Sequence, residues 1–297
     1  MTPRCVYLYV PGNSPSLIQA SMVAGADVVV LDLEDAVAPG EKDAARHLVC
    51  EAIKALPWEG QELAVRVNSP GSSEGPLDIS AVVAAGARLL RVPKVDTPEQ
   101  LVALDRILDG AEAESYLQSG SVRVLVSVES ARGLLSAGQI AFASRRLDGL
   151  SIGGEDLTAD FGAVRSREGD ELAYARTAVV CAARAAGIDA IDTVFAQVDD
   201  DEGLFNDARR AARLGFDGKS VISPRQIPIV RRAFCPDPGE VTHAQRVVAA
   251  AEKALSAGQG VVSVGGRMVD APVIKRAERV LALARLANGG KRYEWQT

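Results

Sequence analysis

The sequence contains few aromatic residues, few histidines and no clustered cysteines. Aromatic residues make up only 4% of its 297 residues, so Ala, Val, Leu and Ile must fill the core. The two histidines, His47 and His243, fall in stretches with a helical pattern, which argues against a Ser-His-Asp or Cys-His catalytic device and against a histidine-rich zinc site. The four cysteines lie far apart, without the spacing of a disulfide framework or a zinc site. A cytoplasmic location is therefore expected.

Positive charge and long apolar runs are also scarce. The net charge is -6 at pH 7 and the pI is near 5.2, so the chain lacks the basic face that nucleic acid or an anionic membrane requires. No apolar run approaches the ~20 residues that cross a bilayer. The apolar stretch before Pro11 is too short for a signal peptide. We expect a globular protein whose partners are neither nucleic acid nor membrane.

Short runs rich in β-branched residues alternate with Ala-rich amphipathic stretches along most of the chain. The expected strands cover residues 6–10, 27–33, 63–67, 89–95, 122–129, 149–154, 189–195 and 218–223. The expected helices cover 15–24, 41–56, 79–87, 97–108, 133–144, 171–186 and 200–214. This order predicts an α/β protein with a (β/α)₈ TIM barrel over residues 1–235. An open doubly wound sheet is the alternative, although no Gly-x-Gly-x-x-Gly motif follows the first strand.

The pattern changes after Phe234. Residues 235–239 read Cys-Pro-Asp-Pro-Gly, and proline is poorly tolerated inside a helix or strand. A helix over 240–257, a glycine-rich stretch over 258–266 and a last helix over 271–287 are expected to follow. Residues 236–297 are therefore predicted to form a C-terminal helical extension, which either caps the barrel or acts as a lid.

Polar residues close most of the predicted strands. In a parallel barrel all strands point their carboxyl ends at one opening, so these side chains should converge on one site. They are Asp32, Glu34, Asp35, Arg66, Asn68, Lys94, Glu129, Glu155, Asp156, Asp192 and Ser223. So many carboxylates in one opening would repel one another unless a cation were present.

Glu129 and Asp156 are the strongest candidates for holding that cation. They end neighbouring strands, whose axes run about 4.8 Å apart, so their carboxylates could share one ion. Oxygen ligands without His or Cys indicate Mg²⁺ or Mn²⁺ rather than zinc. Two carboxylates also leave coordination positions for water and substrate, as a catalytic site requires. The alternative is that both acids form ion pairs or cap helices at the starts of loops.

Two cations are expected at the same opening. Arg66 closes an apolar strand, and its guanidinium could grip a substrate carboxylate or pair with Asp32 or Glu34. Lys94 could form a Schiff base, as lysines at strand ends do in some barrel aldolases, or could balance the charge of the acids.

Eight motifs in one order carry a family resemblance. They are RCVYLYVPGN (4–13), VVVLDLEDAV (28–37), VRVN (65–68), VPKV (92–95), SVESARGL (127–134), GGEDLTADFG (153–162), GFDGKSVISPRQI (215–227) and GGRMVDAP (265–272). Together they resemble the citrate lyase β-subunit family, which is part of the HpcH/HpaI aldolase group with the malyl-CoA and citramalyl-CoA lyases. The resemblance covers nearly the whole chain.

The resemblance implies Mg²⁺-dependent carbon–carbon lyase chemistry on a CoA thioester, in a homotrimer of TIM barrels. By motif, Glu129 and Asp156 match the metal ligands, and Arg66 matches a carboxylate clamp. Glu34 and Asp35 match acids that hold waters around the metal. In the last motif, Asp270 matches an acid that a neighbouring subunit brings over the site, which would give the C-terminal extension the role of a lid.

Two departures from the family pattern concern the substrate-binding residues. The family has Ile-His-Pro where this chain has Ser223 between Ile222 and Pro224, and a hydroxyl cannot titrate near neutral pH. A basic residue that commonly follows the first motif is replaced by Ser14. The remaining candidates for binding substrate or CoA are Arg4, Arg66, Lys94, Lys219, Ser223 and Arg225. Three of these cations, Arg4, Lys219 and Arg225, are the candidates for contacting the CoA phosphates.

The predicted activity is reversible cleavage of a carboxylated 3-hydroxyacyl thioester to an acyl-CoA, or acyl-carrier-protein, thioester and a small 2-oxo acid. Asp270 would move the proton at the thioester α-carbon. The alternatives are a thioesterase, an aldolase that acts on free 2-oxo acids, and a non-catalytic subunit of a larger lyase complex.

Overall fold

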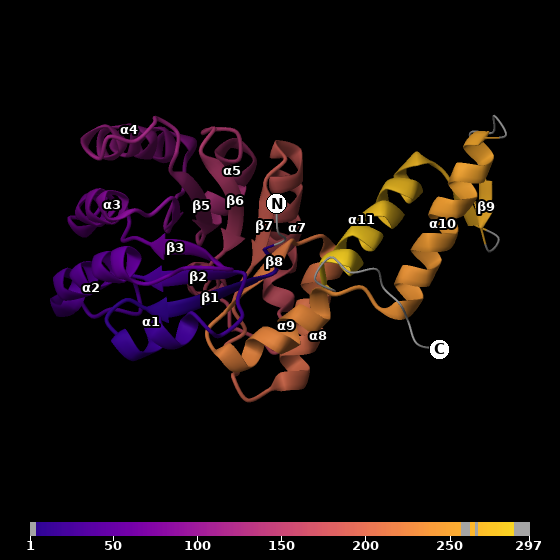
Figure 1. Cartoon of the computed structure of the whole chain (residues 1–297), viewed down its shortest axis with the longest axis horizontal. Coiled ribbons are helices and arrows are strands. Elements are labelled where there is room, and N and C mark those ends of the chain that lie inside the picture. The colour runs from indigo at the N-terminus through magenta and orange to yellow at the C-terminus, as the bar shows by residue number, and fades with distance from the viewer. Residues whose placement is uncertain (1–3, 257–261, 265–266, 288–297) are drawn as a thin grey trace. The chain divides into compact units, whose positions relative to one another are not determined.

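The computed structural model describes residues 4–256, 262–264 and 267–287, which fall into two compact units (Figure 1). One unit is Arg4–Arg231, and the other begins at Arg232. The division lies inside helix α9 (Ile227–Phe234), whereas the sequence placed the boundary after Cys235.

The first unit is a closed barrel of eight parallel strands in sequence order. The strands are β1 (Val6–Pro11), β2 (Val28–Asp32), β3 (Glu62–Arg66), β4 (Leu89–Val92), β5 (Arg123–Val128), β6 (Leu147–Ile152), β7 (Asp189–Asp192) and β8 (Gly218–Val221). The ring closes where β8 pairs with β1, with Tyr7 opposite Ser220. The predicted TIM barrel is thus confirmed, and the open sheet is excluded.

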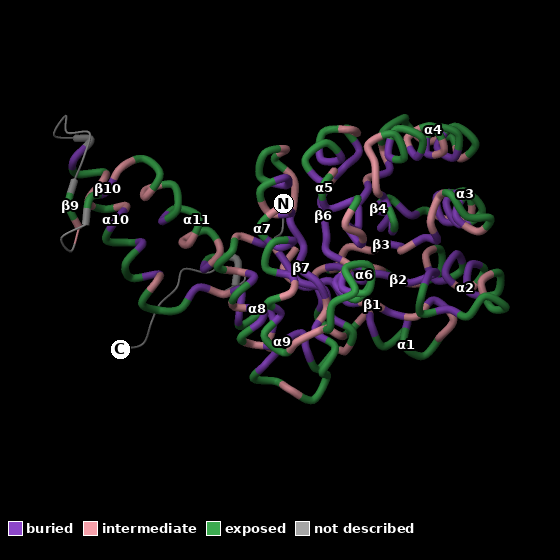
Figure 2. The backbone as a smooth tube through the Cα atoms, turned by 180° about the vertical axis from the view of Figure 1, so that it is seen from behind, coloured by how far each residue is buried: buried purple, intermediate pink, exposed green. Residues whose placement is uncertain are grey.

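The barrel strands are covered on both faces, as parallel strands require. All five residues of β2 are buried, and Figure 2 shows the strands as buried inside a ring of partly exposed helices. An apolar layer fills the interior near the amino ends of the strands, with Tyr7, Leu89, Leu125 and Ile191 among its members. This layer leaves room for polar side chains inside the barrel at the carboxyl ends of the strands.

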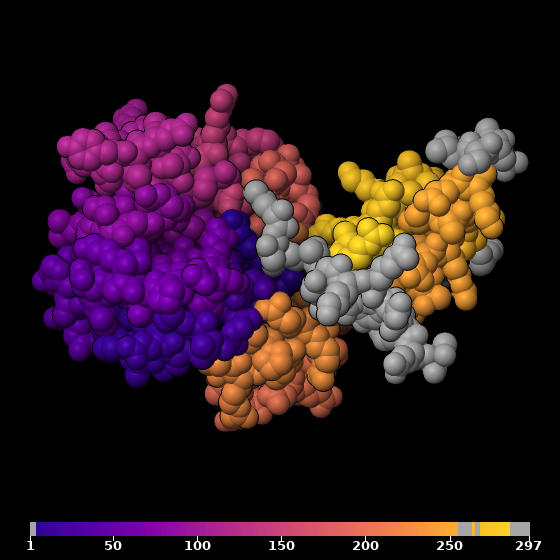
Figure 3. All heavy atoms as spheres, viewed as in Figure 1, coloured from indigo at the N-terminus to yellow at the C-terminus, as the bar shows by residue number. Residues whose placement is uncertain are grey.

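The helices follow the strands around the barrel. They are α1 (Pro15–Ser21), α2 (Lys42–Ala55), α3 (Glu74–Ala85), α4 (Pro98–Glu114), α5 (Ala131–Ile140), α6 (Gly154–Asp160), α7 (Ala173–Ala186), α8 (Asp201–Leu214) and α9, with short 3₁₀ turns at Pro39–Glu41, Asp170–Leu172 and Pro224–Gln226. Helix α4 begins at a capping box, in which the Thr97 side chain and the Gln100 backbone N–H pair. Arg231 of α9 donates to Asp27 at 2.8 Å, and Figure 3 shows α9, in orange, beside the indigo N-terminal segments.

Helices α6 and α9 were not predicted from the sequence. They contain seven and eight residues, too few for a helical period to stand out. Helix α6 also starts at two glycines, which read as the end of a strand and the start of a loop.

The second unit consists of two helices and a two-stranded antiparallel sheet. Its elements are α10 (Pro238–Ser256), β9 (Val262–Val264), β10 (Arg267–Val269) and α11 (Ala271–Ala287). Its small core includes Val247, Val269 and Ala277. Part of the predicted glycine-rich stretch, at 258–261 and 265–266, lies outside the described residues, and the rest of it belongs to the sheet. No described helix has the length and hydropathy to cross a membrane.

Candidate active site

A cavity of about 390 Å³ lies at the carboxyl ends of the barrel strands. Its lining combines acidic, basic and hydroxyl side chains from strands β1 to β8 and from the first turn of α6. The lining residues are Tyr9, Pro11, Asp32, Asp35, Ala36, Arg66, Arg91, Ser127, Glu129, Ile152, Gly153, Gly154, Glu155, Asp156, Thr193, Val194, Ser220 and Ile222. The predicted strand-end residues therefore converge in part: Asp32, Asp35, Arg66, Glu129, Glu155 and Asp156 line the cavity, whereas Glu34, Asn68, Lys94, Asp192 and Ser223 do not.

Glu129 directly follows β5 and lies in the cavity wall. The next residue, Ser130, caps α5 by accepting a hydrogen bond from the Gly133 N–H at 2.9 Å, which fixes where Glu129 leaves the strand. The Glu129 side chain is buried, and its Oε2 has no hydrogen-bond partner among the described residues. Burial, with the charges of Glu34 and Asp156, raises the pKa of Glu129 to about 7. A cation beside Oε2 would reverse this rise.

The backbone of Gly153 packs directly against Glu129. A Cβ atom at position 153 would lie 2.5 Å from the Glu129 Cγ and 2.9 Å from its Oε1, both closer than van der Waals contact. Gly154 is equally close to Thr193, whose hydroxyl accepts a hydrogen bond from the Gly154 N–H at 2.9 Å. The two glycines let α6 start against the wall that holds Glu129.

Asp156 projects from the first turn of α6 and lines the same cavity. Its pKa is raised by partial burial first and by Asp35 second, with Lys94 and Arg66 opposing the rise. Within the described part of the chain, no three or more His, Cys, Asp or Glu side chains cluster as a complete metal cage. A pair of oxygen donors, one of them buried without a partner, fits a divalent ion that keeps positions for water and substrate.

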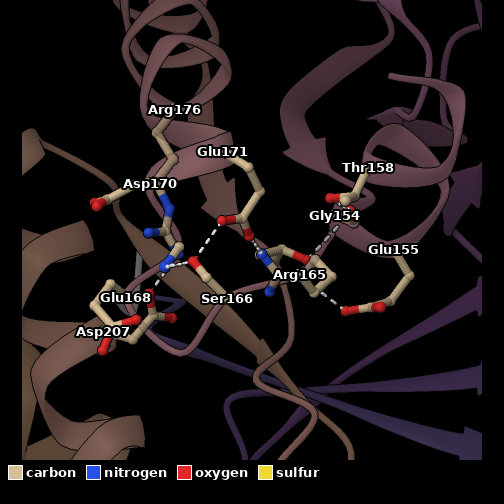
Figure 4. A network of polar contacts seen from close by, with 12 residues as sticks. Gly154, Glu155, Thr158, Arg165, Ser166, Glu168, Asp170, Glu171, Arg176 and Asp207 are labelled. Carbon is tan, nitrogen blue, oxygen red and sulfur yellow. Dashed lines mark hydrogen bonds and ion pairs between the residues drawn. The ribbon is translucent and has the colours of Figure 1, made fainter. Parts of the chain in front are cut away.

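A polar network anchors the loop after α6 to that helix (Figure 4). The Arg165 guanidinium contacts Glu155 Oε1 at 3.0 Å and Glu171 Oε1 at 2.6 Å, so it joins the start of α6 to the 3₁₀ turn before α7. The Ser166 hydroxyl donates to Glu171 Oε2 at 2.6 Å. Since Glu155 precedes Asp156, these contacts help to position the acid that faces the cavity.

Arg66 lies at the end of β3 and is held by three acids. Its Nε and Nη2 donate to Asp32 at 2.7 and 2.6 Å, and its Nη1 lies 3.0 Å from Glu34 Oε2 and 3.4 Å from Asp35 Oδ2. The guanidinium also lies 5.0 Å from the centre of the Tyr9 ring. Pairing with Asp32 and Glu34, one of the two predicted roles, is therefore present in the structure, and Arg66 still lines the cavity.

Lys94 pairs with the same acids. Its Nζ lies 2.8 Å from Glu34 Oε1 and 3.9 Å from Asp35 Oδ1, and its backbone has a φ of 57°, in the left-handed region. The hydrogen bond to Glu34 raises the pKa of Lys94. A Schiff-base lysine needs the neutral amine, so the pairing favours charge balance.

Two of the predicted substrate-binding residues, Arg4 and Lys219, lie outside the cavity lining. Arg4 precedes β1, at the amino ends of the strands, where it forms ion pairs with Glu62 at 2.6 Å and Asp148 at 2.5 Å. Lys219 is completely buried, and its Nζ contacts Asp192 and Asp207 at 2.6 Å each. Neither side chain lines the cavity, and the positive charge of each is matched within the protein.

The remaining predicted residues have local structural contacts. The Ser223 hydroxyl caps the following 3₁₀ turn by accepting from the Arg225 N–H at 3.3 Å. The Arg225 side chain is 71% exposed and pairs with the exposed Asp199 at 3.3 Å. Asp270 belongs to the second unit, where its side chain accepts a hydrogen bond from the Val273 N–H at 3.3 Å at the start of α11.

Sequence reasoning missed the residues that form the inner part of the cavity. These are Tyr9, Arg91, Ser127, Thr193 and Ser220. They lie inside or at the end of strands rather than in the loops, so a search of strand ends passed over most of them. The available signal was a polar side chain at an inward position of an otherwise apolar strand, as Arg91 is in Leu-Leu-Arg-Val. Both histidines are exposed on helices, as expected.

Comparison with known proteins agrees with this geometry. The model of the HpcH/HpaI aldolase/citrate lyase family matches residues 5–224, so the chain belongs to this family. It is 43% identical over 281 residues to the citrate lyase subunit beta of Leuconostoc mesenteroides subsp. cremoris, covering 95% of this chain and 93% of the relative. It is 34% identical over 305 residues to the L-malyl-CoA/beta-methylmalyl-CoA lyase of Cereibacter sphaeroides, covering 96% and 95% of the two chains.

A solved structure shares the fold over most of the chain. The protein CitE from Mycobacterium tuberculosis, in complex with magnesium, acetoacetate and coenzyme A, superposes with a TM-score of 0.81 at 32% identity. The match covers 95% of this chain and 98% of the other. The resemblance expected from the eight sequence motifs is confirmed, and the family is one of lyases.

Proposed function

We propose that this chain reversibly cleaves a carboxylated 3-hydroxyacyl thioester into an acyl thioester and a small 2-oxo acid, with Mg²⁺ as cofactor. The observation that carries the proposal is the buried Glu129 carboxylate, whose Oε2 has no hydrogen-bond partner among the described residues, with Asp156 in the same cavity. The lyases among its relatives, and the CitE complex with magnesium, acetoacetate and coenzyme A, support the choice of metal and reaction.

Glu129 and Asp156 would hold the ion, and water and substrate oxygens would take its other positions. When bound, Mg²⁺ supplies Lewis-acid polarisation of the 2-oxo carbonyl group. Glu34 and Asp35 would accept hydrogen bonds from water around the ion. Arg66 and Lys94, which Glu34 already holds in place, oppose the rise in the pKa of Glu34 that burial causes.

In the condensing direction, Asp270 would remove a proton from the α-carbon of the acyl thioester. The α-carbon would then form a bond to the carbonyl carbon of the 2-oxo acid, and Arg66 would offset the negative charge that develops on the carbonyl oxygen until that oxygen takes a proton from water and becomes the 3-hydroxyl group. In cleavage the hydroxyl group gives its proton to water, the same carbon–carbon bond breaks, and Asp270 returns a proton to the α-carbon. The family resemblance assigns this acid to a neighbouring subunit, so the proposal includes a homotrimer.

A carrier-protein thioester is the second candidate for the acyl donor. Arg4 and Lys219, two of the three cations expected to contact the CoA phosphates, are matched by acids within the barrel unit. Only the exposed Arg225 remains of that group. Because few cations are available to bind the CoA phosphates, acyl-carrier-protein thioesters should be tested beside CoA thioesters.

The main test is the substitution Glu129→Gln. It keeps the shape of the side chain but removes the charge that would hold Mg²⁺, so we expect turnover to fall by about a thousandfold, the effect of losing several kcal/mol of charge stabilisation. Mg²⁺ titration calorimetry and a condensation assay with acetyl-CoA and a panel of small 2-oxo acids measure this.

EDTA should abolish wild-type activity reversibly. Wild-type turnover in metal-free buffer would refute the proposal, and release of free CoA with an intact hydroxy acid would indicate a thioesterase.

Asp270→Asn tests the proton transfer separately. Asparagine caps a helix about as well as aspartate, so α11 should keep its start while the proton acceptor is lost. We expect turnover to fall by about a thousandfold, within the usual range for a general base. The affinity for the 2-oxo acid should change by less than about twofold. Full turnover in this variant would remove Asp270 from the mechanism.

A further inference from the structure

Arg91 forms the floor of the cavity. It comes from an inward position of β4, its side chain is buried, and it lines the cavity. Its Nε donates to Ser127 Oγ at 3.3 Å and its Nη1 donates to Ser220 Oγ at 3.2 Å. Since β4 and β8 are opposite members of the ring of eight strands, the side chain crosses the barrel interior to reach Ser220. The guanidinium therefore lies below the opening, at the inner end of the cavity.

The charge of Arg91 has no acid within ion-pair distance among the described residues, although Arg91 lies near enough to Glu129 to oppose the rise in the pKa of that carboxyl. None of the described carboxylates forms an ion pair with it, whereas Arg66 holds Asp32 through two nitrogens at 2.6 and 2.7 Å. Its partners are two neutral hydroxyls, at distances beyond the most favourable for such bonds, and the Tyr9 ring, whose centre lies 4.9 Å away. A guanidinium is permanently charged and offers five N–H donors, so an arginine buried in this way is suited to receive an anion.

The shape of the donor set indicates which anion. A guanidinium binds a planar carboxylate through two parallel hydrogen bonds, and Arg91 lines the same cavity of about 390 Å³ as Glu129 and Asp156. Glu129 and Asp156 would anchor one end of a 2-oxo acid near the opening. A second carboxylate on the same molecule would then meet Arg91.

We propose that Arg91 is a specificity-determining residue, which binds a second carboxylate and so selects 2-oxo acids with two carboxylates over those with one. The proposal rests on the function proposed above, because it takes the metal-anchored oxo acid as its starting point. Ser127 and Ser220 hold the guanidinium across the barrel in the orientation that receives the carboxylate.

The test compares the binding of oxaloacetate and pyruvate, which differ by one carboxylate, to the full-length protein in Mg²⁺ buffer by calorimetry. We expect the wild type to prefer oxaloacetate by at least tenfold. Arg91→Met should reduce oxaloacetate affinity by at least tenfold and change pyruvate affinity by less than twofold. Arg91→Lys keeps the positive charge but loses the paired N–H donors of the guanidinium, so it should retain only part of the preference for oxaloacetate over pyruvate. The lysine variant replaces the methionine variant in this test if the methionine variant fails to fold.

The outcomes separate this inference from the proposed function. If the wild type binds pyruvate in an Mg²⁺-dependent manner but both Arg91 variants keep the wild-type preference, the role of Arg91 is refuted and the proposed function stands. A residue that only balanced the charge of Glu129 would weaken both oxo acids equally, which also refutes the inference. If the wild type binds neither oxo acid, both proposals fail.

Discussion

The two ends of the barrel use charge in different ways. At the amino ends of the strands, Arg4 pairs with Glu62 and Asp148, and Glu112 pairs with Arg146. At the carboxyl ends, the buried Glu129 Oε2 has no hydrogen-bond partner, and Arg91 has no acidic partner, among the described residues. Unmatched buried charge is costly for folding, so its presence in the cavity wall indicates that a ligand completes it. Charge at the amino ends is thus matched within the protein, whereas the cavity at the carboxyl ends also holds buried polar atoms that are left for a ligand.

The strongest way to break this comparison is Lys219→Met, which disrupts a closed charge network behind the cavity wall, where Lys219 Nζ also donates to the Thr193 carbonyl oxygen at 2.7 Å. Lys219 and Arg176 both bind Asp192 and Asp207, so the methionine would leave two buried carboxylates with one cation. We expect the free energy of unfolding to fall by about 3–5 kcal/mol, the usual effect of removing one partner of a buried pair. Urea denaturation monitored by circular dichroism measures this.

The control for Lys219→Met is the kinetic behaviour of the same variant. At a temperature where it remains folded, its KM for the acyl thioester should match that of the wild type. A large rise in KM with unchanged stability would instead restore the thioester-binding role that the sequence assigned to Lys219.

The error over Lys219 shows what sequence reasoning lacked. Neighbouring residues of a strand face opposite sides, so Lys219 lies among the helices while Ser220 lies in the cavity. The motif that contains both residues gives no sign of which one faces inward. The register of β8 against β1 and β7 decides it, and this register follows from the closure of the whole barrel.

The barrel itself was predictable because eight apolar runs and the helices between them carry a strong local signal. The residues at the opening were also predictable, since parallel strands end together: Arg66, Glu129 and Asp156 all line the cavity. Arg91 was not, because it contacts Ser220, which is 129 positions away in the sequence. Such a contact exists only once β4 and β8 face each other.

A second test concerns the matched charges at the amino ends of the strands. Glu112 accepts hydrogen bonds from Arg146 and from the Val122 N–H, and although burial opposes ionisation, these bonds lower its pKa to about 2. A carboxylate with a lowered folded-state pKa stabilises the protein above its ordinary pKa of about 4.3, and this contribution is lost as the pH falls towards 2. The contribution at neutral pH should be on the order of 2–3 kcal/mol.

The measurement compares urea denaturation of the wild type and Glu112→Gln between pH 7 and pH 3. The difference in stability should be largest at neutral pH and should narrow below about pH 4.5, because the carboxylate then takes up a proton in the unfolded chain while it stays ionised in the folded protein. A difference that stays constant with pH would show that the carboxylate charge contributes nothing. Turnover of the folded variant should equal that of the wild type, in contrast to Glu129→Gln.

The smallest expected effect comes from adding one methyl group beside Glu129, at position 153. Gly153→Ala would place a Cβ atom 2.5 Å from the Glu129 Cγ, so the carboxylate must turn away from its place beside Asp156. We expect Mg²⁺ affinity to fall by about tenfold, as when a neighbour that orients a metal ligand is changed.

Gly110→Ala in α4 is the matched control, because nothing lies within 4 Å of its added methyl group. It should raise stability by about 0.5–1 kcal/mol and leave Mg²⁺ binding unchanged. Equal Mg²⁺ affinity in both variants would mean that the packing of Glu129 against Gly153 does not prepare it to hold the metal.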